Sequence, residues 1–235
     1  MAGRLSGASG PVKTSRLGVS WASAVLALFR AGPSDGWFWS EDASPPIAFC
    51  VHALVQDGLR VRPFDRHPEG DGTLRARELD AHTWNAWLSA VVAAQSRLSG
   101  RVGAPDWPPD RAGLATLVEA ASAPVALCPG TPELRVRLGE LWVEYQPIGE
   151  RWKWDLTSGP RGVRNRLAPG EQRWLWKALV PFHDRLPTLS VFLVDYPVPV
   201  VMPRPPATCL IAPADTSADY ARQVLSAAEL LAAAR

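Results

Sequence analysis

The segment 133–156 (ELRVRLGELWVEYQPIGERWKWDL) constrains the fold most, because apolar and polar residues alternate along three short runs. Alternate side chains of a strand share one face of a sheet, so the pattern predicts a three-stranded antiparallel meander. Residues 138–140 and 147–149 would supply the reversals, since Gly permits positive φ and Pro fixes φ. One face would carry nine side chains: Leu134, Val136, Leu138, Leu141, Val143, Tyr145, Trp152, Trp154 and Leu156. Trp154 is therefore expected to be a core residue.

Around this central meander the sequence predicts helices and additional strands, which gives the α+β class. Helical spacing of apolar residues predicts helices over 17–30, 81–98 and 171–180, and a shorter one over 110–121. Another helix, over 47–57, follows Pro45 and Pro46 and ends before Gly58. A last helix begins at Ser217. Strands are predicted over 59–64, 189–196 and 208–212.

The length of 235 residues, 47% of them hydrophobic, suits one domain with a substantial core. Residues 1–16 have no apolar segment and are interpreted as a flexible leader, although the apolar run behind them leaves a signal peptide as an alternative. Residues 17–235 are predicted to form a single α+β domain. The alternative division is a helical amino half (17–105) and a sheet-centred carboxyl half (106–235).

Charge and cysteine usage argue against several functional classes. The formal net charge of +2 provides no global field that would draw nucleic acid or an anionic membrane to the protein. The apolar runs are shorter than the about 20 residues that cross a bilayer. Cys50, Cys128 and Cys209 form neither a disulfide framework nor a CxxC metal motif. These features predict a cytoplasmic protein, and the excess of Arg over Lys is typical of a GC-rich bacterial genome.

The densest polar cluster is the segment 63–72 (PFDRHPEGDG), which carries Asp65, His67, Glu69 and Asp71 after a predicted strand. Carboxylates and an imidazole at a strand end can hold a divalent metal or act as acid and base. One alternative function is therefore a metal-assisted hydrolase. Turn chemistry explains the same Pro, Gly and Asp residues unaided, so we expect no bound metal and no cofactor.

His183 is a further catalytic candidate, because the adjacent Asp184 could orient its imidazole. No Gly-x-Ser-x-Gly elbow or other recognisable nucleophile accompanies it. A zinc site built on the Cys50-x-His52 pair is a poor fit, because residues two apart on a helix do not share a face. A local hydrogen bond at a helix end is the simpler role expected for His183.

The loop 158–166 (SGPRGVRNR) presents Arg161, Arg164 and Arg166 ahead of a predicted helix whose first turn carries Arg173. Guanidinium groups suit phosphate or carboxylate, and a helix N-terminus adds a favourable dipole. The pattern therefore indicates an anion-binding loop, and a nucleic-acid accessory protein is the second alternative function. No Walker, Gly-x-Gly-x-x-Gly or named nucleic-acid motif supports it.

The cluster Trp37-Phe38-Trp39 lies between two polar turn segments, in a chain with 11 tryptophans. If the cluster is exposed, it would anchor a protein partner, because aromatic residues dominate interface hot spots. If it is buried, it would form an edge strand. We expect Trp37 and Trp39 to be partly exposed and to bind another protein chain.

No coherent set of nucleophile, base and oxyanion donors can be assembled from the sequence, whereas candidate interface residues can. The sequence therefore predicts a non-catalytic binding or accessory component of a bacterial multi-protein assembly, with another protein chain as its partner and no membrane contact. The metal-assisted hydrolase and the nucleic-acid accessory protein stay as alternatives.

Overall fold

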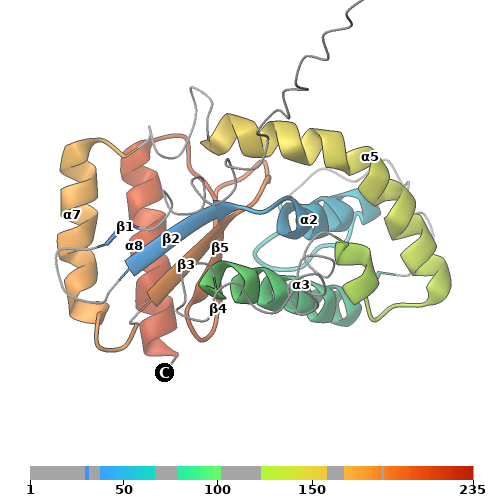
Figure 1. Ribbon diagram of the computed structural model, residues 1–235, viewed down its shortest axis with the longest axis horizontal. Helices are drawn as coiled ribbons and strands as arrows, with labels where there is room; N and C mark the ends of the chain where they lie inside the picture. The colour runs from blue at the N-terminus through green and yellow to red at the C-terminus, as the bar shows by residue number, and fades with distance from the viewer. Residues whose placement is uncertain are drawn as a thin grey trace, which may run out of the picture.

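The computed structural model describes residues 30–31, 38–66, 79–101, 123–157, 167–186 and 188–234. In these residues one sheet is covered by several helices (Figure 1). The elements in chain order are β1 (Arg30–Ala31), β2 (Phe38–Ala43), α2 (Pro45–Asp57), α3 (Ala81–Arg101), η1 (Pro124–Leu127), α5 (Pro132–Thr157), α7 (Pro169–Leu179), η2 (Val180–Phe182), β3 (Thr188–Leu193), β4 (Val200–Arg204), β5 (Thr208–Ala212) and α8 (Ser217–Ala233).

The strands form one five-stranded mixed sheet in the order β1-β2-β3-β5-β4. The central pairings, β2 with β3 and β3 with β5, are parallel. The two outermost strands pair antiparallel, β1 with β2 and β4 with β5. The combination of helices with a mixed sheet confirms the α+β class. The predicted antiparallel meander is wrong, because none of these strands comes from residues 133–156.

Helices cover both faces of the sheet. Along β3, Phe192 belongs to the core formed mainly with α2, α3 and α5, whereas Val191 belongs to the core formed mainly with α7 and α8. The neighbouring β5 divides in the same way, with Leu210 on the first side and Ile211 on the second. Successive side chains of a strand point to opposite faces. The fold therefore has three layers with the sheet in the middle (Figure 1).

Residues 133–156 lie in a single helix, α5. Its buried side chains recur every three or four residues, at Leu134, Leu138, Leu141 and Tyr145. That spacing defines one face of a helix. Val136, which the strand register placed on the same face, lies on the opposite side and is 63% exposed. The buried residues fit both periods, and the length of the run and its few β-branched residues favour the helix.

The helix also corrects the roles expected for Trp154 and for the two turn segments. Trp154 is 59% exposed, so the prediction of a core residue is wrong. A Cβ on Gly139 would meet nothing within 4 Å. A Cβ on Gly149 would come within 2.7 Å of Tyr145 Cε1 and 3.3 Å of Pro45 Cβ. Gly149 therefore permits a close approach between α5 and α2, and it does not reverse the chain.

Pro147 lies inside α5, where it removes a backbone hydrogen bond and its ring crowds the preceding turn. Figure 1 shows α5 bent, and proline is the usual cause of a sharp bend in a helix. The bent helix contacts both α2 and β2. Leu156 near its end joins the core beneath α7 and α8, so one helix serves both faces of the sheet.

The helices with clear terminal signals are where the sequence predicts them. The helix predicted over 47–57 is α2, which begins with Pro45 and ends at Gly58, a residue with φ of 70°. The helix predicted over 81–98 is α3, and its first turn is capped because the Thr83 N–H donates to Asp80 Oδ1 at 2.8 Å. Thr216 caps α8 by accepting a hydrogen bond from the Asp219 N–H.

Other predicted elements have a different structure from the one expected or lie outside the described residues. The segment 59–64, predicted as a strand, forms a tight turn with an isolated bridge between Val61 and Phe64. The predicted helices 17–30, apart from residue 30 in β1, and 110–121 lie outside the described residues, as does the suggested boundary at residue 105. No helix in the described ranges is both long and apolar enough to cross a bilayer.

Replacing Leu138 by alanine tests the helical register of α5. Leu138 is fully buried, so Leu138→Ala should lower the free energy of unfolding by about 2–5 kcal/mol. Trp154→Ala should change it by less than about 0.5 kcal/mol, as is usual for surface positions. Urea denaturation followed by circular dichroism measures both values. Large losses in both variants would contradict the helix, because only a strand places the two side chains on one face.

Candidate functional site

Three carboxylates lie along the border of the sheet that is formed by the carboxyl ends of its parallel strands. Asp42 is the penultimate residue of β2, and Asp195 and Asp215 follow the ends of β3 and β5. The registers of both parallel pairs bring these strand ends level. In open sheets, ligands bind outside the carboxyl ends of parallel strands. We call Asp42, Asp195 and Asp215 the edge carboxylates.

Two of the edge carboxylates hold their protons more tightly than usual. Burial raises the pKa of Asp42, and the positive charge of Lys153 on α5 opposes part of that rise. Asp195 keeps exposed surface, but partial burial of its carboxyl group raises the pKa of Asp195 as well. Perturbed carboxyl groups are enriched at functional sites, although structural contacts perturb them too.

Two buried hydroxyl groups near this edge have no hydrogen-bond partner among the described residues, Tyr145 Oη and Ser44 Oγ. Tyr145 is 1% exposed, and its ring centroid lies 5.6 Å from that of Phe49 and 4.7 Å from that of His52. Burial raises the pKa of Tyr145, and the charge of Asp195 raises it further. An unsatisfied buried hydroxyl lowers the free energy of unfolding by about 1–3 kcal/mol. The Tyr145 hydroxyl therefore destabilises the contact between α2 and α5.

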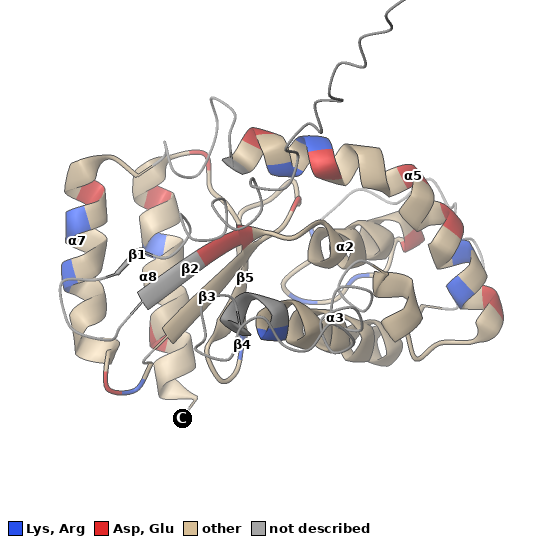
Figure 2. Cartoon of the chain, viewed as in Figure 1, with Lys and Arg blue, Asp and Glu red and all other residues tan. Residues whose placement is uncertain are grey.

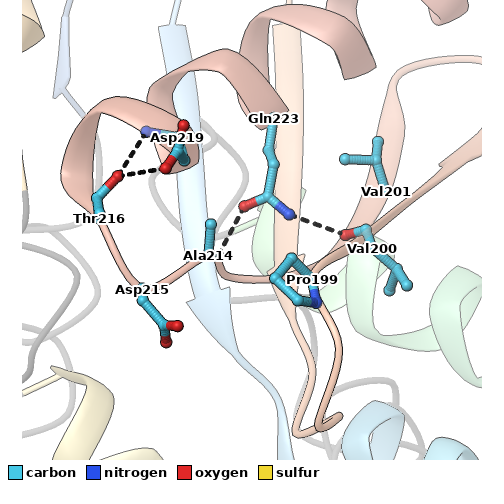
Figure 3. A pocket seen from close by; sticks show the side chains of 8 residues that line it. All are labelled: Pro199, Val200, Val201, Ala214, Asp215, Thr216, Asp219 and Gln223. Carbon is cyan, nitrogen blue, oxygen red and sulfur yellow. Dashed lines mark hydrogen bonds between the residues drawn. The ribbon is translucent and has the colours of Figure 1, made fainter. Parts of the chain in front are cut away.

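A pocket of about 490 Å³ opens where β4 begins, β5 ends and α8 begins (Figure 3). It includes Asp215, one of the edge carboxylates. Its lining is mixed, with the apolar residues Pro199, Val200, Val201 and Ala214 beside the polar residues Asp215, Thr216, Asp219 and Gln223. The volume lies within the range of small-molecule sites.

Gln223 on α8 fixes one wall of this pocket. Its Oε1 accepts a hydrogen bond from the Ala214 N–H at 2.8 Å. Its Nε2 donates to the carbonyl oxygens of Ala212 at 2.9 Å and of Val200 at 3.4 Å. Figure 3 shows the side chain between Ala214 and Val200. One amide group therefore ties α8 to both β5 and β4.

A second surface is the outward side of α5. The described residues include seven exposed large apolar side chains, and four of them lie on α5: Val136, Val143, Ile148 and Trp154. Each of the four is at least 54% exposed. We call them the α5 outward face. Large exposed apolar groups gathered on one element indicate an interaction surface, whereas scattered ones are ordinary.

The rim of the α5 outward face is charged. Figure 2 shows acidic and basic residues along α5 between the uncharged ones. The exposed acidic residues of the helix are Glu133, Glu140, Glu144, Glu150 and Asp155, and its exposed basic residues are Arg135 and Arg151. The exposed charged side chains of α5 are thus mostly acidic, and the partly exposed Arg137 and Lys153 bring its basic residues to four against five acids.

Of the four residues predicted to form a hydrolytic loop, only Asp65 is described. Its Oδ2 lies 3.8 Å from Nε of Arg62, and its carbonyl oxygen accepts a hydrogen bond from Arg60 at 2.9 Å. The other three lie outside the described residues: His67, Glu69 and Asp71. The described part of the chain contains no group of three or more metal-ligating side chains. The hydrolase hypothesis stays a prediction.

His183 lies just after η2, and its backbone N–H donates to the carbonyl oxygen of Val180 at 3.2 Å. Burial lowers the pKa of His183, and the charge of Asp184 opposes this shift. The strand ends that carry the edge carboxylates lie elsewhere in the fold. The structure therefore does not bring His183 and these acids together as one site.

The predicted partner and anion residues are only partly described. Phe38 and Trp39 lie in β2, whose backbone pairs with β1 and β3, and Trp37 lies outside the described residues. Arg173 is exposed on α7, and its Nε donates to the Pro169 carbonyl oxygen at 3.3 Å. The remaining loop residues are not among those described: Arg161, Arg164 and Arg166. Both binding roles stay predictions.

Sequence reasoning missed the edge carboxylates and Gln223. A usable signal was present, because Asp195 ends the apolar run SVFLVD and Asp215 ends the run LIAPAD. An acidic residue directly after a buried strand suggests a polar strand end. In comparisons with known proteins, no protein-family model, curated protein or solved structure matches this chain.

The desolvated carboxyl group of the half-buried Asp42 should make stability depend on pH. Folding raises the pKa of Asp42 above the ordinary value of 3.8. The contribution of the protonated Asp42 to the free energy of unfolding is therefore complete below pH 3.8, and it is lost as the pH rises through the raised pKa. Asp42→Asn cannot lose a proton. The stability of this variant relative to the wild type should therefore increase between about pH 4 and pH 7. Urea denaturation across this range measures the difference.

The control for this experiment is Asp155→Asn, which removes an exposed carboxylate from α5. Its stability should follow that of the wild type with pH. A difference between Asp42→Asn and the wild type that does not change with pH would contradict the assigned burial of Asp42.

Removing the Gln223 amide should destabilise the junction of α8 with the sheet. Gln223→Ala leaves the Ala214 N–H without its partner and removes the donor to two carbonyl oxygens. The expected loss in the free energy of unfolding is about 1–3 kcal/mol. Replacement of the exposed neighbour, Arg222→Ala, should cost less. Equal losses in thermal or urea denaturation would show that the amide does not stabilise this junction.

Proposed function

We propose that this protein is a non-catalytic binding component that docks another folded protein on the α5 outward face. One observation carries the proposal: α5 exposes Val136, Val143, Ile148 and Trp154 to solvent, whereas its leucines are buried. Exposed aromatic and aliphatic groups of this kind form the apolar centre of protein interfaces.

The chemistry of the partner follows from the rim. The exposed acids Glu140, Glu144 and Glu150 lie between and beside the apolar residues. Complementary charges steer association and fix orientation. The partner is therefore a protein with an apolar surface bordered by Lys or Arg. Because α5 is bent at the outside of the fold (Figure 1), a concave partner surface would bury more of it than a flat one.

This assignment places the partner surface on α5 instead of on the Trp37-Phe38-Trp39 cluster. Trp39 lies in a strand whose backbone is paired on both sides, with Arg30 and with Leu189. Such pairing restricts the backbone of Phe38 and Trp39 more than a free loop would. On α5 the exposed fraction of each of the four apolar side chains is at least 54%.

The Val143→Ser, Trp154→Ser double variant tests the proposal. Both side chains are exposed, so circular dichroism should show an unchanged fold. A partner captured by the wild-type protein is identified and purified, and its Kd is measured by isothermal titration calorimetry. The double variant should weaken binding by about tenfold or more, because interface anchors contribute over 1 kcal/mol each.

The matched control is Trp174→Ser, which removes an exposed tryptophan from α7. It should leave Kd within about twofold, and raising the salt concentration should weaken the wild-type complex because the rim is charged. A partner that binds the double variant with unchanged Kd, or that loses affinity with Trp174→Ser alone, would exclude the α5 outward face as the docking surface.

A further inference from the structure

The pocket at the start of α8 is separate from the α5 outward face and is not explained by protein docking there. The pocket has a volume of about 490 Å³, with apolar walls on the β4 side and polar groups on the α8 side. Gln223 holds β4, β5 and α8 together at one wall through three hydrogen bonds. The cavity is therefore framed by connected elements, and its shape does not depend on a single loop.

The two acids of the pocket differ in their partners. Asp219 accepts a hydrogen bond from Thr216 Oγ1 at 2.6 Å and forms an ion pair with Arg222. Asp215 is exposed, and no described residue forms a salt bridge with it. The charge of Asp219 is therefore compensated within the protein. Asp215 therefore adds a negative charge that has no ion-pair partner among the described residues, beside an apolar wall.

We propose that this pocket binds a cationic group, an alkylammonium or an alkylguanidinium, through Asp215. The aliphatic part of such a ligand would contact Pro199, Val200 and Ala214, and its charged end would pair with the carboxylate. A neutral or anionic ligand of the same size would leave the Asp215 charge unpaired. The cationic group is either a free amine or the side chain of a partner protein.

The backbone of β4 distinguishes these two sources. The Ile211 carbonyl oxygen accepts from the Val194 N–H at 3.0 Å, so residue 211 of β5 faces β3. Backbone groups alternate along a strand, which turns Ala212 and its register partner Val200 toward each other. Val201 and Pro203 therefore direct their backbone groups to the side of β4 on which no described strand pairs. A ligand with flanking peptide groups can reach the Val201 N–H and carbonyl oxygen beside the pocket.

The experiment uses the full chain and follows backbone amide shifts by NMR titration. The probes are butylammonium, butylguanidinium, butanol and butyrate at equal ionic strength. Both cations should give saturable shifts at Ala214, Asp215 and Gln223, and the other two probes should not. Asp215→Asn should weaken binding of the cations by about fivefold, the upper range for an exposed ion pair. Glu229→Gln removes an exposed acid of α8 that does not line the pocket, and it should leave Kd unchanged.

The source is assigned by a fifth probe, N-acetyl-lysine-N-methylamide. Tighter binding than that of butylammonium indicates a peptide side chain, and equal binding indicates a free amine. The proposal is wrong if neither cation saturates, if butanol binds as tightly as butylammonium, or if Asp215→Asn leaves the Kd of both cations unchanged. Because Asp215 is exposed, the variant is expected to remain folded, which the NMR spectrum itself verifies.

Discussion

Burial of both faces of β3 and β5 is the constraint on which the rest of the fold depends. Val191 and Ile211 must be covered on one side, and Phe192 and Leu210 on the other. Parallel strands buried on both faces need helical layers on each side. The parallel pairing of β2 with β3 also needs a crossover connection. The chain between them meets both demands, because it contributes α2, α3 and α5 to one layer and α7 to the other.

The same arrangement concentrates polar chemistry at one edge. Parallel strands end together, so acids that follow apolar runs in distant parts of the sequence become neighbours. The bend of α5 carries its last turns across this edge, which places Lys153 close enough to act on Asp42. The cost is local, because Tyr145 and Ser44 keep buried hydroxyl groups without described partners. A polar edge beneath α5 thus results from the strand topology.

The sequence predicts the elements whose ends carry chemical signals. Asp80, Thr216 and Gly58 define helix ends through local hydrogen bonds or a positive φ, and they act without tertiary help. The interpretation of 133–156 failed because Leu134 and Leu138 satisfy a period of two as well as a helical period. Pro147 and Gly149 then favoured a turn in the sequence pattern. In the structure, Pro147 bends α5 and Gly149 permits the close approach of α5 to α2. The edge carboxylates depend on strand order, which local patterns do not determine.

Strand β4 has no neighbouring strand on its outer side among the described residues, and this has a consequence for how copies of this protein behave together. An open strand is a template on which another chain can add strands and, by repetition, build an aggregate. Of the two residues of β4 that face outward, Pro203 has no N–H to offer, and only Val201 presents both backbone groups. A neighbouring strand would find one complete pairing position, too few to hold a continuous ladder. The proline thus protects concentrated protein from edge-to-edge growth while leaving Val201 accessible.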